Sequence, residues 1–248
     1  MIKSFHFQHK TFNFPVGEMQ VSVFTVAQKE VSMEFIFEKN EDIIELLMVC
    51  DAIKRDGNKL MLLTMHYVPF GRQDRVAVSG EAFSLKVFCD LVNSLGFQHV
   101  LITDPHSDVT PALLNNCTVV TQDQVFIERL NGNKDFLLIS PDGGALKKIY
   151  KLAKKAKVPV IECTKKRNVE NGEVTETVVH ADDLQGKDCV IVDDICDGGR
   201  TFIEIAKVLK TKNCGKIFLC VTHGFFTKGL QVFDGLIDEV YTMKGKVK

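Results

Sequence analysis

The sequence predicts an α/β protein of two similar lobes, each with a central, mostly parallel sheet flanked by helices. Continuous apolar segments of strand length alternate with segments of helical periodicity along most of the 248 residues. Uninterrupted apolar strands are typical of parallel sheets, because both faces of such sheets are covered. Several of the strands end in clusters of Arg, Gln, Asp and His. A ligand site is therefore expected beyond the carboxyl ends of the strands.

The first half of the chain begins with an alternation of apolar and polar residues. This alternation predicts half-exposed antiparallel strands at 19–26 and 31–38. A helix is expected over 40–57, because Asn40 can cap it, acidic residues fill its first turn and Gly57 follows its end. The later elements of this half are strands at 59–68, 99–104 and 119–121 and helices at 79–96 and 122–130.

The second half repeats the alternation of strand and helix. Its strands are expected at 135–140, 158–163, 188–194, 216–222 and 239–243, and its helices at 143–156 and 200–211. The polar segment NGNKD separates the two halves. The predicted lobes are therefore residues 1–132 and 133–248.

Composition is that of an ordinary globular protein, with 45% hydrophobic and 25% charged residues and a formal net charge of −1. No nucleic-acid or membrane partner is expected from this balance. None of the eight cysteines forms a CxxC pair, which argues against structural zinc, and most lie inside apolar runs. Buried free thiols, no leader-like N-terminus and no apolar run near about 18 residues predict a cytoplasmic protein.

The stretch VIVDDICDGGRT places two carboxylates, a glycine pair and a hydroxyl at the end of a strand. Gly198 and Gly199 free the backbone to turn, and the helix that follows directs its positive end at the loop, which suits a phosphate. Asp193 and Asp194 can accept hydrogen bonds from vicinal hydroxyls and help to hold Mg²⁺. Phosphate and diol together describe a ribose 5-phosphate moiety. The alternative is a plain strand-to-helix turn capped by Asp193.

This stretch resembles the phosphoribosyl pyrophosphate (PRPP) loop of type I phosphoribosyltransferases and of the ribose-phosphate pyrophosphokinases, or PRPP synthetases. The resemblance implies two lobes of type I phosphoribosyltransferase fold. It also implies that Asp193 and Asp194 hold the ribose hydroxyls. The residues that would hold the 5′-phosphate are Asp197, Gly198, Gly199, Arg200 and Thr201.

Further segments resemble the synthetases rather than the transferases. PFGRQDR resembles their ATP-binding segment and implies nucleotide contacts for Arg72, Gln73 and Asp74. FPVGE resembles a segment that clasps adenine from a neighbouring subunit, which implies roles for Phe14 and Glu18 and a homodimer or larger assembly.

Four more segments complete the resemblance, which spans residues 14 to about 242 in the family's order. TDPHSD and SPDGG imply Mg²⁺ positioning by His106 and Asp142. TKKR resembles a basic segment whose matching residues, Lys165 and Arg167, would be catalytic by stabilising charge on the transferred group. VTHGFF is also similar to a synthetase segment, and its His223 is expected to be structural.

The expected reaction is Mg-dependent pyrophosphoryl transfer, ATP + ribose 5-phosphate → PRPP + AMP. Two alternatives stay open: a phosphoribosyltransferase that consumes PRPP, and a catalytically silent, synthetase-like regulatory subunit. Val16 replaces an aspartate of the family segment, and Arg200 stands where the family usually has glycine. The chain is also shorter than typical members, so a minimal enzyme without allosteric control by nucleotides is expected.

Overall fold

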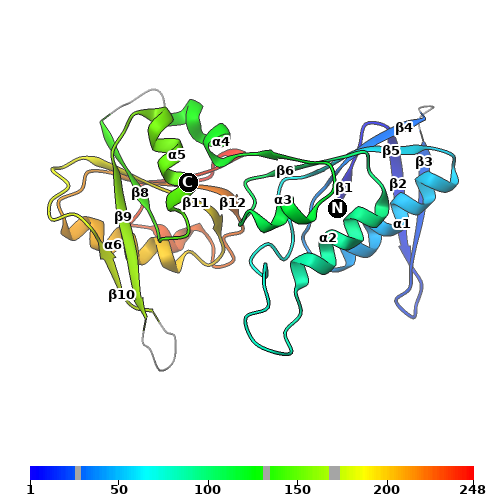
Figure 1. The fold of residues 1–248 in the computed structure, drawn as a ribbon, viewed down its shortest axis with the longest axis horizontal. Helices are drawn as coiled ribbons and strands as arrows, with labels where there is room; N and C mark the ends of the chain where they lie inside the picture. The colour runs from blue at the N-terminus through cyan, green and yellow to red at the C-terminus, as the bar shows by residue number, and fades with distance from the viewer. Residues whose placement is uncertain (26–28, 131–134, 168–173) are drawn as a thin grey trace. The chain divides into compact units, whose positions relative to one another are not determined.

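The computed structural model describes residues 1–25, 29–130, 135–167 and 174–248. They form two compact units, Met1–Val120 and Thr121–Lys248 (Figure 1). Helix α4 (Gln122–Leu130) belongs to the second unit, because Phe126 and Leu130 share a core with residues of α5 (Leu146–Ala156). The lobe boundary expected at 132/133 falls outside the described residues.

The sheet of the first unit has five strands. In spatial order they are β1 (Ile2–Lys3), β4 (Glu30–Phe35), β5 (Lys59–Met65), β6 (His99–Thr103) and β7 (Cys117–Val120). All neighbours from β4 to β7 are parallel, whereas β1 is antiparallel to β4. The antiparallel expectation is therefore confirmed for β3 (Met19–Thr25), which pairs with β2 (Phe7–Asn13). For β4 it holds at the edge that pairs with β1, whereas the pairing of β4 with β5 is parallel. Alternating burial of β4 produces the same sequence pattern as an antiparallel strand.

Helices α1 (Glu41–Arg55) and α2 (Ser84–Leu95) pack on this sheet. Their buried residues, such as Leu46 and Phe88, join Leu63 and Ile102 of the strands in one core, and Figure 1 shows both helices on one side of the strands. Asn40 makes no side-chain capping bond to α1. Asp42 instead accepts the backbone N–H groups of Glu38 and Lys39 at 2.7 and 2.9 Å, because its carboxylate turns back over the start of the helix. A short helix, α3 (Val109–Leu113), follows β6.

The second unit has a seven-stranded sheet. In spatial order its strands are β10 (Val174–Val179), β9 (Val160–Arg167), β8 (Phe136–Ser140), β11 (Asp188–Cys196), β12 (Ile217–Gly224), β13 (Glu239–Thr242) and β14 (Gly245–Lys246). The five strands from β9 to β13 are parallel, and β10 and β14 are antiparallel edges.

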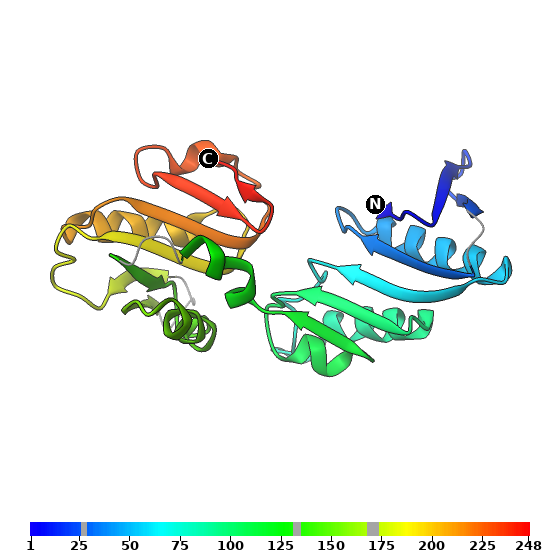
Figure 2. The same cartoon turned by 90° about the horizontal axis from the view of Figure 1, so that it is seen from above.

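Helices cover both faces of this second sheet (Figures 1 and 2). Cys189 and Ile191 of β11 pack in the core with α6 (Arg200–Thr211). Val190 and Val192, which alternate with them, pack in a second core with α4 and α5. Since successive side chains of a strand point to opposite faces, β11 is apolar on both faces from Cys189 to Val192, as a central parallel strand should be. The predicted α/β architecture is confirmed.

Within the described ranges, the helices are too short or too polar to cross a lipid bilayer.

Candidate active site at the strand ends

The longest strand of the second unit, β11, carries the principal candidate residues at its carboxyl end. Its parallel neighbours are β8 and β12, in register through Ile191–Ile139 and Asp193–Val221. Asp142 follows β8, and His223 lies near the end of β12. Carboxyl ends of adjacent parallel strands meet at one edge of a sheet, and therefore these loops converge where ligands of open α/β sheets bind.

Three carboxylates gather at this edge. The pKa of Asp193 is raised well above its ordinary value of 3.8, first by burial and then by the negative charges of Asp194 and Asp142. Asp194 is buried, and the Lys148 ammonium of α5 lies 3.5 Å from its Oδ2. The Oδ1 of Asp142 accepts the N–H groups of Gly144 and Ala145 at 3.1 and 3.2 Å, which fixes the start of α5. The edge therefore gathers three carboxyl groups, and Lys148 lies beside one of them.

The glycine pair makes the turn from this strand end into α6. Gly199 has φ +79°, a left-handed conformation that side chains disfavour. A Cβ on Gly199 would lie 2.6 Å from Cζ of Phe233, a fully buried side chain of the 3₁₀-helix η1 (Leu230–Phe233). Only glycine fits this position, and the turn lets α6 begin at Arg200 directly beyond the carboxylates. Arg200 is exposed and Thr201 is half-buried.

The other wall of this turn is the segment after β12. Asp197 Oδ1 accepts a hydrogen bond from the Thr227 hydroxyl at 2.7 Å, and its carbonyl accepts the Thr227 N–H at 3.2 Å. The Phe225 N–H donates to the carbonyl of Cys196 at 2.8 Å. The seven predicted residues from Asp193 to Thr201 thus lie on one continuous strand, turn and helix start, held from the side by residues 225–227.

The first unit has a second polar edge, at the ends of β5 and β6. Arg72 and Gln73 are exposed in the loop after β5, and Asp74 is half-buried. A Cβ on Gly71 would lie 3.6 Å from Cβ of His106, which follows β6. The structure therefore brings the PFGRQDR and TDPHSD segments together.

His66 also lies at this edge, although it was not among the predicted site residues. The His66 imidazole shares a 3.0 Å hydrogen bond with the Thr103 hydroxyl and lies 3.7 Å from Glu34 Oε1. His66 directly follows β5, and its two partners belong to β6 and β4, so His66 joins the ends of three neighbouring strands. Its position just after an apolar strand was the available signal. Lys148 and Thr227 had no comparable signal, because their contacts join segments that are distant in sequence.

Phe14 and Glu18 lie in the turn between β2 and β3. Both are exposed, and Phe14 makes an edge-to-face contact with Phe12 at 5.0 Å between ring centres. The Phe14 N–H donates to the Glu18 carbonyl at 2.8 Å. The hairpin turn thus presents an apolar ring and a carboxylate to solvent.

The side chains of Lys165 and Arg167 lie outside the described residues. Their backbones belong to β9, which pairs with β10.

The side chains predicted to position Mg²⁺ match the preference of this ion only in part. Carboxylate oxygens fit a hard cation that prefers oxygen, whereas the imidazole of His106 is not a usual Mg²⁺ ligand. Nowhere in the described ranges do three His, Cys, Asp or Glu side chains group to hold a metal. A magnesium ion here is therefore expected to keep several waters and to share phosphate oxygens of the substrate.

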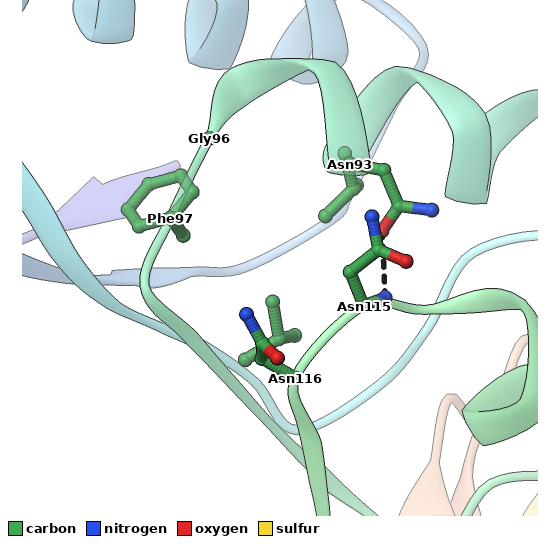
Figure 3. A pocket seen from close by; sticks show the side chains of 7 residues that line it. Asn93, Gly96, Phe97, Asn115 and Asn116 are labelled. Atoms are coloured by element: carbon green, nitrogen blue, oxygen red, sulfur yellow. Dashed lines mark hydrogen bonds between the residues drawn. The ribbon is translucent and has the colours of Figure 1, made fainter.

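A small hollow of about 230 Å³ lies beside the end of α2 in the first unit (Figure 3). Asn93 donates to the Leu113 carbonyl and accepts the Asn115 N–H, each at 2.8 Å. The two ends of the amide thus join α2 to the last residue of α3 and to the segment that follows α3. Asn93 therefore has a structural role, which is to hold these segments together.

Residues 5–96 match the family described as the N-terminal domain of ribose phosphate pyrophosphokinase, and residues 122–232 match the phosphoribosyl transferase domain. The chain is 32% identical to the ribose-phosphate pyrophosphokinase of Mycoplasma pneumoniae over 88% of its own length and 69% of the relative's. The chain belongs to the ribose-phosphate pyrophosphokinase family. The Mycoplasma genitalium pyrophosphokinase is also 32% identical, and the chain spans 63% of its length.

The fold agrees with this family. The phosphoribosylpyrophosphate synthetase of Mycobacterium smegmatis aligns with a TM-score of 0.81 at 21% identity, over 95% of this chain and 80% of that one. Both units of the present chain therefore have the α/β fold that the loop motifs implied. The resemblance predicted from the loop motifs is confirmed.

Proposed function

We propose that this protein is a ribose-phosphate pyrophosphokinase that converts ATP and ribose 5-phosphate to PRPP and AMP with Mg²⁺. The observation that carries the proposal is the end of β11, where two adjacent carboxylates lead directly into a glycine turn and the start of α6. Ribose 5-phosphate needs acceptors for its hydroxyls and a cradle for its phosphate, spaced by the length of a sugar. The family to which the chain belongs supports the same substrate.

The second unit would bind ribose 5-phosphate. Asp193 and Asp194 accept hydrogen bonds from the ribose hydroxyls in this account. The Gly198–Gly199 turn and the first turn of α6 receive the 5′-phosphate, because the N–H groups at a helix start have no partner within the helix. Asp197 holds the turn through Thr227, and Arg200 and Thr201 add a charge and a hydroxyl.

The first unit would bind ATP. Arg72 suits phosphate oxygens, and Gln73 and Asp74 suit a base or a ribose. His106, which packs beside Gly71, would orient the Mg²⁺-bound nucleotide through water or phosphate, and Asp142 would help to hold the ion. The ion would supply charge neutralisation on the polyphosphate.

The catalytic step needs no covalent nucleophile from the protein. The 1-hydroxyl of ribose 5-phosphate gives up its proton to solvent as it attacks the β-phosphorus of ATP. A new P–O bond forms, and AMP leaves with the electrons of the broken P–O bond. Lys165 and Arg167 would stabilise the negative charge that spreads over the transferred group.

The proposed active form is a homodimer or larger, in which Phe14 and Glu18 reach a neighbour's ATP site. Their exposure in a hairpin turn supports such a contact. We also place the protein in the cytoplasm, because all eight cysteines are free and mostly buried, as in a reducing compartment.

The test is the nucleotide product. Purified protein with ATP and Mg²⁺ should release AMP only when ribose 5-phosphate is present, with PRPP in equal amount. ADP as product would identify a kinase that transfers one phosphoryl group. PRPP consumption with a purine or pyrimidine base would identify a phosphoribosyltransferase, and no turnover with either substrate set would leave a regulatory subunit.

A further inference from the structure

Lys228 lies against the glycine turn, although it is 29 residues beyond Gly199 in the sequence. A Cβ on Gly198 would meet the Lys228 Cδ, Cε and Cγ atoms at 3.4, 3.5 and 3.6 Å. The carbon chain of the lysine therefore runs along the face of Gly198. A larger residue at Gly198 would have to displace it.

The backbone around Lys228 is fixed to the same turn. Thr227 bonds Asp197 through its hydroxyl at 2.7 Å and through its N–H at 3.2 Å. On the other side, the Gly229 N–H donates to the Phe226 carbonyl at 2.7 Å, and the Gln231 amide donates to the Lys228 carbonyl at 3.0 Å. The lysine thus projects from a rigid support, which lowers the entropic cost of using it to bind a ligand.

The positive charge of Lys228 would offset negative charge at the glycine turn. The turn lies next to Asp193, Asp194 and Asp197, and a phosphate monoester would bring about two more negative charges. Lys148 faces Asp194 on the α5 side. Within the described residues, the Lys228 ammonium forms no ion pair. Lys228 is exposed, and the carbon chain that carries its ammonium passes beside Gly198.

We propose that Lys228 is a substrate-binding residue, which closes the phosphate cradle opposite the start of α6 and selects the phosphorylated sugar over free ribose. This inference rests on the proposed function, because it assigns the phosphate of ribose 5-phosphate to that turn. Lys228 acts in binding and has no part in transferring the pyrophosphoryl group.

The test compares Lys228→Met with the wild-type protein. Methionine keeps an unbranched apolar stem against Gly198 and removes only the charge. The Kd for ribose 5-phosphate, measured by calorimetry with Mg²⁺ and without ATP, should rise about tenfold or more, the usual weight of a charge-assisted hydrogen bond. The KM for ribose 5-phosphate should rise equally, while kcat and the KM for ATP stay unchanged. Lys228→Arg should restore most of the binding.

Lys154→Met is the matched control. Lys154 is exposed in the last turn of α5, and α5 packs on the opposite face of the sheet from α6. The substitution makes the same change in net charge, and its Kd should equal that of the wild type. Thermal unfolding of all variants identifies any loss of binding that comes from misfolding.

The outcomes separate this proposal from the proposed function. An unchanged Kd in Lys228→Met, beside normal wild-type binding and turnover, overturns the role of Lys228 and leaves the pyrophosphokinase intact. Wild-type binding that depends on Lys228, but without PRPP formation, supports the cradle and overturns the reaction. A wild-type protein that binds no ribose 5-phosphate overturns both.

Discussion

Gly199 is a residue at which conformation and space both exclude a side chain. Its φ is +79°, and a Cβ at this position would lie only 2.6 Å from Phe233 Cζ. Gly199→Ala should lower the free energy of unfolding by about 1–3 kcal/mol, because it combines backbone strain with overpacking. It should also weaken ribose 5-phosphate binding, because the turn must shift away from the helix start.

Gly143→Ala is the control for this prediction. Gly143 has nothing within 4 Å of a Cβ position and no positive φ. Urea unfolding should give a value close to that of the wild type. Equal stability of the Gly199 and Gly143 variants would show that the turn does not pack as described.

Asp193 is a residue that should favour ribose 5-phosphate binding but lower the stability of the folded protein at neutral pH. Its pKa is raised by burial and by Asp194 and Asp142. Above the ordinary value of 3.8 the unfolded carboxyl ionises freely whereas the folded one resists, so its contribution to stability falls as pH rises. Asp193→Asn should therefore increase the free energy of unfolding at pH 7 and weaken ribose 5-phosphate binding. Urea titrations between pH 7 and pH 3 should show that this gain in unfolding free energy vanishes near pH 3.

At the scale of elements, α4 and α5 are joined by one buried carboxylate. Asp123 has a side chain only 2% exposed, with the Lys151 Nζ at 2.9 Å and the Lys155 Nζ at its other oxygen. Burial alone would raise the pKa of Asp123, but the hydrogen bonds from Lys155, Lys151 and Thr121 outweigh it and lower the pKa to about 2. The pair of helices is thus stabilised most when this carboxylate is charged.

Asp123→Asn should cost about 2 kcal/mol of unfolding free energy at pH 7. Because the folded pKa is the lower one, the stabilisation is complete above the ordinary value of 3.8 and is lost as pH falls toward about 2. Asp90→Asn, at an exposed ion pair with Lys86, should cost less than about 1 kcal/mol. A pH-independent loss in Asp123→Asn would contradict this account of the ion pair.

Most of the strands and helices could be predicted because their periodicity is local. The parallel pairing of β4 with β5 could not, since a parallel strand with alternating burial has the same pattern as an antiparallel one. The short α3 and the antiparallel β10 lack a clear pattern. In the site, the carboxylate and glycine residues of one segment could be predicted together. Lys148 and Thr227 could not, because only the folded chain brings them to Asp194 and Asp197.

At the scale of the whole molecule, the two units divide the proposed chemistry. Each unit has its own core and its own polar edge at the carboxyl ends of its strands. ATP is assigned to the first unit and ribose 5-phosphate to the second. The hairpin turn with Phe14 and Glu18 is the element assigned to a neighbouring copy.

This assignment predicts complementation between two inactive variants. Phe14→Ala/Glu18→Ala should lower turnover on the order of tenfold or more through misplaced ATP, and Asp193→Asn/Asp194→Asn should abolish ribose 5-phosphate use. Activity should reappear when both variants are co-expressed, because the intact hairpin of one chain then completes the ATP site of a chain whose sugar site is intact. Either variant expressed alone is the control. Persistent inactivity of the mixture, with mixed oligomers demonstrated, would show that the hairpin acts within its own chain.

The most direct test of the central claim is a ³¹P NMR time course of the purified protein with Mg²⁺, ATP and ribose 5-phosphate. The account predicts that the resonances of PRPP and AMP grow together as those of ATP fall, and that Lys165→Ala nearly abolishes the change. Growth of ADP with a ribose bisphosphate, or an unchanged spectrum from folded protein, would contradict pyrophosphoryl transfer.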